Sequence, residues 1–454
     1  MNSPPYKWTA TRALELLRND SISVEAYAQS LLGRIQERDR TIKAWAHLDP
    51  ELVLSQARLL DKIPIENRGP LHGLAIGIKD IMDTKEYGSR IYDGHQPSAD
   101  SHAVATLRAA GALIFGKTTT TEFAVANYGP WTANPHNPKH TPGGSSSGSA
   151  AAVADFQVPL SLGSQTGGSV IRPASYTGVF AMKPTFGAIS TEGQKPCAPS
   201  FDTIGFFARS IEDLRLLADV FGLKDDEAPK ETSLDQISVA VIKTPFWSSA
   251  GYGTESAMDN SISVLERNKV KVEEVSFPAE VSDSKVLGRI QDVIIQSEAR
   301  VSLLPEYRLS KAKLGYEVRD IVKNKSNITQ EELRDAYDEY AKMRVIINDL
   351  AKKYDVILAP SAVDHAPVGL DDMGSPIFNT LWTGFHMPVI NIPSSSGAWG
   401  MPIGVSLVAP RFQDQQLLQT GKAISEILMA DGTRRSQDAE GLWKRSWDTD
   451  CISE

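Results

Sequence analysis

Short apolar segments alternate with amphipathic ones along this chain of 454 residues, and this alternation limits the folds that it can adopt. Residues 74–78 are apolar and include two β-branched side chains, which is typical of a buried strand. Residues 103–110 have a helical pattern that ends at Gly111. Further strands are expected at residues 112–115, 159–163, 237–242, 270–275, 356–358, 389–392 and 404–408. Helices that alternate with buried strands predict one α/β layer structure around an extended sheet.

No linker rich in glycine, proline or serine divides the chain, so a single domain over residues 1–454 is expected. Ser23 and Ser149 are expected to cap helices, and Thr329 with Glu332 forms a capping box that begins a long helix. We distinguish four parts: an N-terminal helical segment at about 8–40, a core at about 70–221, a more variable region at about 222–355, and C-terminal strands and helices at about 356–454.

Charge and cysteine content exclude several classes of protein. The 47 lysines and arginines against 56 aspartates and glutamates give a net charge of −9, which does not favour nucleic acid as a partner. Two cysteines, Cys197 and Cys451, cannot build a disulfide framework or a cysteine-rich zinc site. The first residues lack the apolar region of a secretory signal, and no apolar stretch is long enough for a membrane span. We therefore expect a cytoplasmic protein without a membrane partner.

Two loops rich in glycine and serine, residues 143–149 and 166–169, stand out. Such loops are often plain surface connections, but their backbone N–H groups can also converge on an anion. Neither loop has the ending of a phosphate-binding P-loop. Residues 144–148 fit the Gly-x-Ser-x-Gly elbow of α/β-hydrolases, with His365 or His386 as the base, but prolines rather than a strand precede them.

A third interpretation combines a lysine with two serines. Lys79 follows the apolar strand at 74–78, where loss of solvent would lower its pKa and leave an amine that can accept a proton. Ser145 and Ser169 lie in the two loops and could supply one hydroxyl that relays the proton and another that attacks. Each residue alone would be unremarkable, whereas the three together indicate nucleophilic catalysis.

At these positions the sequence resembles the amidase signature family, the Ser–cisSer–Lys hydrolases of C–N bonds. The similarity covers nearly the whole chain, and its most specific parts are Pro142-Gly143-Gly144-Ser145-Ser146 and Thr166-Gly167-Gly168-Ser169. Other matching segments are residues 77–80, 109–112, 116–118, 122–124, 134–135, 183–187, 358–361, 388–393 and 401–404. The resemblance implies a single large domain with a mixed sheet covered by helices.

The resemblance also implies roles for individual residues. Ser169 would be the acylated nucleophile, Ser145 the bridging serine 24 residues before it, and Lys79 the final base and acid. In the family the peptide bond before the bridging serine is cis. No metal and no cofactor take part. The oxyanion hole would consist of the backbone N–H groups of Thr166, Gly167, Gly168 and Ser169.

Several positions depart from the common family pattern beside these residues. Gln165 stands where the family commonly has aspartate, and Ile171 where it usually has arginine, which follows here as Arg172. Ser147 and Thr177 occupy positions that are often glycine and cysteine. All three proposed catalytic positions are filled, so the departures concern the charges around them.

Three further groups of residues have more than one interpretation. His136 and His140 are four residues apart, but the surrounding prolines favour loop histidines over a metal site. Asp80 and Asp83 could orient Lys79 or could be solvated. As residues that line the substrate pocket we expect Asn127, Tyr128, Trp131, Trp382 and Phe385.

The function expected from this sequence is hydrolysis of a small carboxylic amide through a seryl acyl-enzyme, by a chain that could form a homodimer. Carbamate, lactam and aryl-acylamide substrates stay open within the same chemistry. A different class is the amidotransferase component that passes ammonia to glutamyl-tRNA with the help of partner subunits. A catalytically inactive scaffold is a third class, which the presence of Lys79, Ser145 and Ser169 disfavours.

Overall fold

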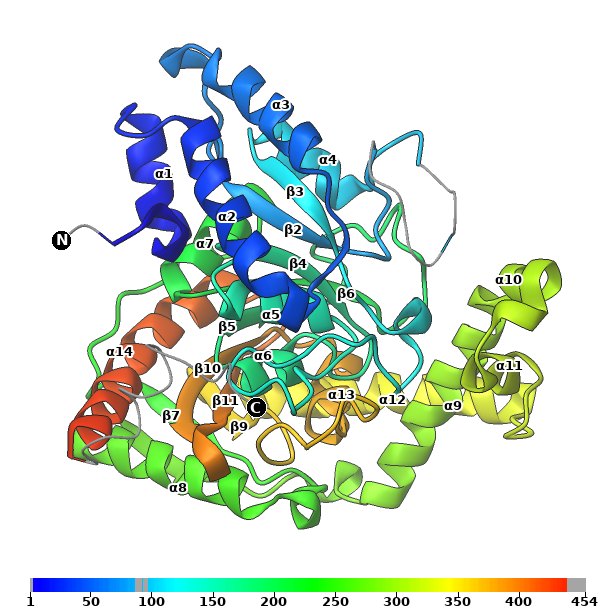
Figure 1. Ribbon diagram of the computed structural model, residues 1–454. Helices are drawn as coiled ribbons and strands as arrows, with labels where there is room; N and C mark the ends of the chain where they lie inside the picture. The colour runs from blue at the N-terminus through cyan, green and yellow to red at the C-terminus, as the bar shows by residue number, and fades with distance from the viewer. Residues whose placement is uncertain (1–2, 86–91, 93–96, 439–454) are drawn as a thin grey trace.

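One sheet of eleven strands runs through the molecule, and its strand order is β1-β3-β2-β4-β6-β5-β10-β11-β9-β7-β8 (Figure 1). The structure is a computed structural model that describes residues 3–85, 92 and 97–438. The strands are β1 (Trp45–His47), β2 (Ala75–Lys79), β3 (Leu113–Thr118), β4 (Leu160–Gln165), β5 (Phe180–Lys183), β6 (Thr203–Ala208), β7 (Ser238–Val241), β8 (Lys271–Glu274), β9 (Val356–Pro360), β10 (Val389–Ser396) and β11 (Pro402–Val408). The fold is therefore a single α/β domain, as the sequence predicts.

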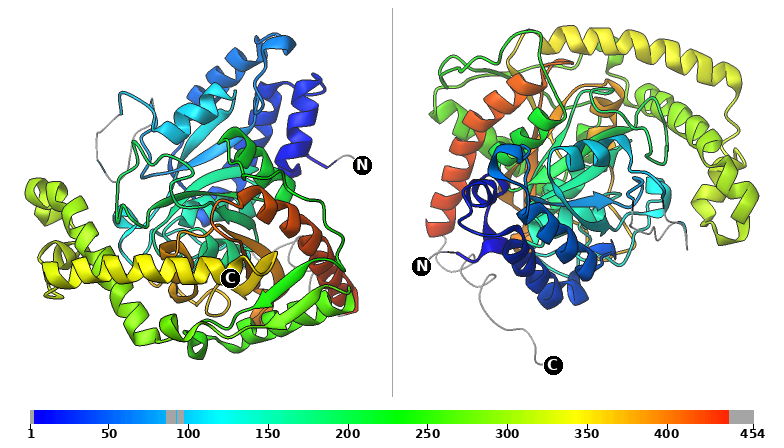
Figure 2. Two further views of the ribbon diagram at one scale, coloured as in Figure 1. Left: turned by 180° about the vertical axis from the view of Figure 1, so that it is seen from behind. Right: turned by 90° about the horizontal axis from the view of Figure 1, so that it is seen from above.

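The helices are α1 (Ala10–Arg18), α2 (Val24–Ile42), α3 (Pro50–Asp61), α4 (His102–Ala109), α5 (Ser147–Ala154), α6 (Ile171–Thr177), α7 (Ile211–Val220), α8 (Tyr252–Arg267), α9 (Ser284–Ser302), α10 (Leu304–Ser310), α11 (Tyr316–Val322), α12 (Gln330–Ala351), α13 (Ile377–Gly384) and α14 (Asp414–Asp438). Figures 1 and 2 show α1–α3 beside β1–β3 at one end of the molecule, and α8 with α14 near the other end. The same views show α9–α11 extending from one side. None of the helices in the described part of the chain combines the length and apolar character that crossing a bilayer requires.

The sheet is mixed, and it has a parallel part towards each of its two edges. β2 pairs with β3 and β4 in parallel, and β7 pairs with β8 and β9 in parallel. In the middle of the sheet, the neighbouring pairs β4–β6, β6–β5, β5–β10, β10–β11 and β11–β9 are all antiparallel. Because parallel strands end at the same edge of a sheet, β2, β3 and β4 bring the segments that follow them close together.

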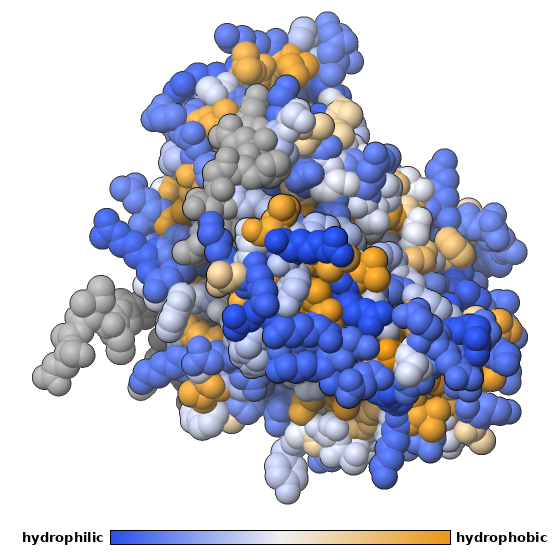
Figure 3. Space-filling view, turned by 90° about the vertical axis from the view of Figure 1, so that its right-hand side faces the viewer, coloured by the Kyte–Doolittle hydropathy of each residue, from blue (hydrophilic) through white to orange (hydrophobic). Residues whose placement is uncertain are grey.

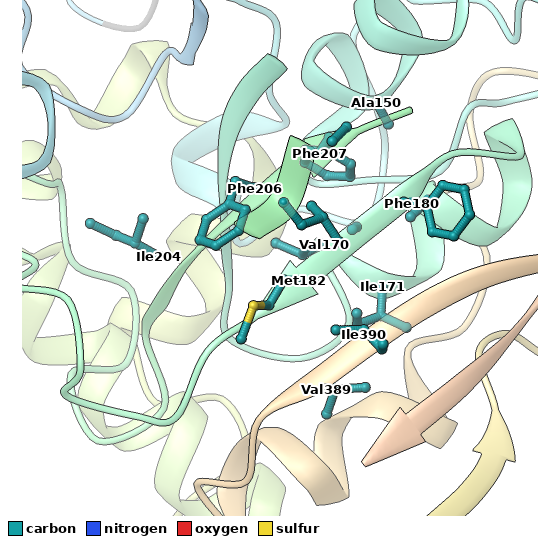
Figure 4. Packing of buried hydrophobic residues seen from close by; sticks show 14 of the residues in the cluster. Ala150, Val170, Ile171, Phe180, Met182, Ile204, Phe206, Phe207, Val389 and Ile390 are labelled. Atoms are coloured by element: carbon teal, nitrogen blue, oxygen red, sulfur yellow. The ribbon is translucent and has the colours of Figure 1, made fainter. Parts of the chain in front are cut away.

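Two short helices in the middle of the chain pack directly on the sheet. Every residue of α5 is buried, and its alanine, glycine and serine side chains allow close approach to β2, β3 and β4. α6 packs against β5, β10 and β11. Figure 4 shows Ile171, its first residue, and Val170, directly before it, in the core with Phe206, Met182 and Ile390. This packing fixes the two loops that precede α5 and α6.

Most elements that the sequence predicts are present. Ser23 accepts a hydrogen bond from the Ala26 N–H at the start of α2, and Thr329 with Glu332 forms the capping box of α12. The expected cap at Ser149 is wrong, because α5 already begins at Ser147 and Ser149 lies inside it. Its hydroxyl instead donates to the Leu162 carbonyl at 2.8 Å. Cys451 lies outside the described residues.

Candidate active site

Three parallel strands end beside one another where the polar residues of the candidate site begin. Lys79 is the last residue of β2 and lies opposite Thr118, the last residue of β3. β4, on the other side of β2, ends at Gln165, directly before the loop of residues 166–169. The sheet therefore brings together segments that are about 40 to 90 residues apart in the sequence.

Lys79 is fully buried and contacts Ser145. Its Nζ lies 2.7 Å from Ser145 Oγ, 2.9 Å from Ser164 Oγ and 3.3 Å from the Ser164 carbonyl oxygen. Burial lowers the pKa of Lys79 to about 7, while the charge of Asp202 acts in the opposite direction. This direction agrees with the expectation for a lysine at the end of an apolar strand, and it favours the unprotonated amine.

The segment around Ser145 is held by contacts on both sides. The Gly144–Ser145 peptide bond is cis, as the family resemblance implies. Ser146 Oγ donates to the Ser164 carbonyl at 3.2 Å. Arg172, on α6, donates to the Gly144 carbonyl at 2.7 Å and also to the carbonyl of Gly374. Arg172 thus links the Ser145 segment to the helix that follows Ser169.

Ser169 lies in the loop between β4 and α6, and 7% of its surface is exposed. Within the described residues no hydrogen bond joins Ser169 to Ser145. A Cβ on Gly168 would lie 3.0 Å from Asn379 Nδ2, so glycine allows α13 to approach the loop closely. The structure brings Lys79 and Ser145 into direct contact and sets Ser169 on the neighbouring loop, next to two glycines.

Gln165, which replaces the aspartate common in the family, organises the start of α6. Its Oε1 accepts hydrogen bonds from the N–H groups of Val170 and Ile171 at 2.8 and 3.0 Å. Its Nε2 donates to Thr383 Oγ1 at 2.9 Å, and that hydroxyl lies 2.8 Å from the Gly167 carbonyl oxygen. The Gln165 side chain therefore accepts these two hydrogen bonds through its oxygen, as a carboxylate could, but it carries no negative charge.

Asp202 is a buried carboxylate of the site that the sequence analysis did not single out. Its two oxygens accept hydrogen bonds from Thr166 Oγ1 at 2.5 Å and from the Cys197 N–H at 2.7 Å. The signal that could have found it is the strand order, because Asp202 precedes β6, the antiparallel neighbour of β4.

Asp80, His136 and His140, which the sequence analysis also considered, bond to partners other than Lys79, Ser145 and Ser169. Asp80 forms an ion pair with the buried Lys117 at 3.3 Å. His136 Nε2 lies 2.9 Å from the Thr177 carbonyl oxygen, and His140 Nδ1 lies 2.8 Å from the Ala366 carbonyl oxygen. Both histidines lie in the loop before α5 and bond to backbone carbonyls.

The structure does not bring together the five residues expected to line the substrate pocket. Trp382 and Phe385 are fully buried in the hydrophobic core, with their ring centroids 6.4 Å apart. Trp131, by contrast, is 68% exposed. The Asn127 N–H donates to Glu317 at 2.7 Å, and the Tyr128 hydroxyl donates to Glu122 at 2.9 Å.

A cavity of about 1200 Å³ lies beyond the carboxyl ends of β2 and β3, on the side that carries α10 and α11. Figure 3 shows this face, on which hydrophobic side chains are visible between hydrophilic ones. Asp80 lines the cavity, although Lys79, Ser145 and Ser169 do not. Its other polar lining residues include Lys117, Thr120, Gln194, Lys195 and Glu306.

Comparisons with known proteins agree with this arrangement. The sequence pattern of the Amidase family matches residues 26–418. A glutamyl-tRNA(Gln) amidotransferase subunit of Lysinibacillus sphaericus is 30% identical, over 90% of this chain and 94% of that protein.

Solved structures show the same fold. A crystal structure of an amidase superimposes with a TM-score of 0.83 at 26% identity, covering 93% of this chain and all of that one. The corresponding glutamyl-tRNA(Gln) amidotransferase subunit of Thermotoga maritima has a TM-score of 0.76 at 26% identity, covering 93% and 95% of the two chains. Fatty acid amide hydrolase, 20% identical, covers 94% of this chain and 87% of its own and shares the fold with a TM-score of 0.84. This chain therefore belongs to the amidase signature family.

Proposed function

We propose that this protein hydrolyses a small carboxamide through an acyl-enzyme on Ser169. The observation that supports the proposal best is the 2.7 Å contact between Lys79 Nζ and Ser145 Oγ, in a buried setting that lowers the pKa of the lysine to about 7. A general base works best when its pKa is near the operating pH, because it is then both available and basic enough.

The reaction has two halves with the same proton path. In the first, neutral Lys79 takes a proton from Ser145, Ser145 takes one from Ser169, and Ser169 Oγ bonds to the amide carbon. The proton then returns through Ser145 to the leaving nitrogen, the C–N bond breaks, and ammonia or an amine departs. In the second half a water gives one proton to the same relay, and its oxygen bonds to the acyl carbon. The bond between this carbon and Ser169 Oγ then breaks, the relay returns the proton to Ser169 Oγ, and the acid departs.

Backbone N–H groups of residues 166–169 are the proposed donors to the negative oxygen that develops on the carbonyl. Removing one such donor typically raises a barrier by about 2.7–4 kcal/mol. The proposal is supported by the hydrogen bonds of Gln165, Thr383 and Asp202, which fix other atoms of this loop and leave its conformation little freedom.

A second candidate is the ammonia-producing component of an amidotransferase. The 30% identity with the amidotransferase subunit of Lysinibacillus sphaericus, over almost the full length of both chains, favours it. The chemistry at Ser169 would be the same, with the ammonia passed to a second reaction instead of being released.

Ammonia or amine release from a panel of amides tests the main proposal. The panel includes glutamine, asparagine, aliphatic amides and anilides, with Ser169→Ala as the inactive variant and the exposed Ser282→Ala as the matched control. We expect turnover by the chain alone, a loss of about 10³-fold or more in Ser169→Ala, and no change in Ser282→Ala. Full turnover by Ser169→Ala would overturn the proposal. Glutamine hydrolysis that requires the other subunits of an amidotransferase would instead support the second candidate.

A further inference from the structure

Asp202 supports the loop that carries Ser169. Its Oδ1 lies 2.5 Å from Thr166 Oγ1, and its Oδ2 accepts the Cys197 N–H at 2.7 Å. The side chain is 5% exposed. Thr166 is the first residue of the loop, so Asp202 anchors the end of the loop that leaves β4.

The sheet register explains why these two residues meet. β4 and β6 are antiparallel, and Gln165 at the end of β4 pairs with Thr203 at the start of β6. The next residue after β4 is Thr166, and the residue before β6 is Asp202, so both leave the sheet at the same point. Their contact therefore follows from the strand pairing.

Burial raises the pKa of Asp202, and the hydrogen bonds from the Thr166 hydroxyl and from the N–H groups of Cys197 and Ala198 only partly offset this rise. The contact with Thr166 does not depend on the protonation state of Asp202, because the Thr166 hydroxyl can donate or accept a hydrogen bond.

We infer that Asp202 is a positioning residue for the reaction at Ser169, because its side chain anchors the nucleophile loop through Thr166. The inference rests on the proposed function, because it assigns Asp202 a role in the activation of Ser169.

Two substitutions test the anchor. In Asp202→Asn the amide can donate to Thr166 Oγ1 through Nδ2 and accept the Cys197 N–H through Oδ1, so both hydrogen bonds are retained. In Thr166→Val the anchor is lost, while Thr166→Ser keeps the hydroxyl and serves as the matched control.

The readout is the rate at which a fluorophosphonate modifies Ser169, measured from about pH 5 to about pH 9, because this rate reports the activated nucleophile without a known substrate. Peptide mass mapping confirms the modified residue. For Asp202→Asn, which keeps both hydrogen bonds, we expect a modification rate close to that of wild type. For Thr166→Val we expect a loss of about tenfold at every pH, with the wild-type rate restored in Thr166→Ser.

Different outcomes overturn different statements. If wild-type Ser169 is not modified, the proposed function fails, and the inference fails with it. If wild-type Ser169 is modified but a folded Asp202→Asn variant loses reactivity, the two retained hydrogen bonds do not account for the role of Asp202, and the anchor is wrong while the proposed function stands. A Thr166→Val variant that reacts like wild type would refute the role of the anchor. The comparison of Thr166→Val with Thr166→Ser tests this role even if Asp202→Asn does not fold.

Discussion

Of the three fully buried lysines of the sheet, Lys79 and Lys183 allow an effect on stability to be separated from an effect on catalysis, whereas Lys117 is paired with Asp80. Lys79 ends β2 and Lys183 ends β5, and burial lowers the pKa of each from 10.5 to about 7. Lys79 contacts Ser145 and Ser164, whereas Lys183 donates to the Pro184 carbonyl at 2.8 Å. We predict that replacing either lysine with methionine stabilises the protein at pH 7 and that only the change at Lys79 inactivates it.

The magnitude follows from the lowered pKa values. A fall from 10.5 to about 7 corresponds to a cost of about 5 kcal/mol, since one pH unit is worth about 1.36 kcal/mol. Lys79→Met also loses three hydrogen bonds worth about 1 kcal/mol each, which leaves a gain in unfolding free energy of about 2 kcal/mol. Lys183→Met loses one such bond, and the attraction of Asp414 is already contained in the lowered pKa, so this variant should gain about 4 kcal/mol.

The sign of the pH dependence is also fixed. Both lysines have a lower pKa in the folded chain than in the unfolded chain, so between about pH 7 and 10.5 the unfolded chain binds more protons. Wild-type stability therefore rises with pH in this window relative to either methionine variant. From pH 7 to pH 9 each variant should lose about 2 kcal/mol of its advantage.

Denaturant unfolding at pH 7 and pH 9 measures the stability difference, and fluorophosphonate modification of Ser169 measures the reactivity. Lys183→Met should be modified at the wild-type rate, and Lys79→Met should not be modified. A Lys79→Met variant that is less stable at pH 7, with a difference that does not change with pH, would refute the reasoning from burial. Loss of modification in Lys183→Met would refute the separation of the two lysines.

Three other substitutions have expected outcomes. Gln165→Met removes the acceptor of two buried N–H groups at the start of α6, so it should cost about 2–4 kcal/mol in denaturant unfolding and slow modification of Ser169. Gly168→Ala would place a Cβ 3.0 Å from Asn379 Nδ2, so it should slow modification at least tenfold; a wild-type rate would show that the loop tolerates displacement. Thr329→Ala removes the capping box of α12, which should lower the unfolding free energy by about 0.5–2 kcal/mol and leave the modification rate unchanged.

The sequence predicts the fold and the central contact well, because both depend on local patterns and on two specific motifs. The apolar run before Lys79 marks a buried strand, which the structure confirms, and burial there lowers the pKa of the lysine. The glycine and serine loops identify Ser145 and Ser169 by their spacing and their resemblance to the family.

Other parts of the site depend on contacts between distant strands and helices, which local patterns do not contain. Asp202 meets Thr166 only because β4 and β6 are paired. Trp382 and Phe385 are aromatic residues, which occur both in pockets and in hydrophobic cores. In this structure both are buried in the core, Trp382 within α13 and Phe385 directly after it. Ser149 has the residue type of a helix cap, but α5 begins two residues earlier against the sheet.

The central claim is that Lys79 and Ser145 act on Ser169 as one unit, and a double-mutant cycle tests it most directly. The modification rate of Ser169 is measured in Lys79→Ala, in Ser145→Ala and in the double variant. Because the proposed relay fails when either member is missing, the double variant should react no more slowly than the slower single variant. If the fold-loss in modification rate of the double variant equals the product of the two single fold-losses, the two residues act independently, and this result would contradict the relay.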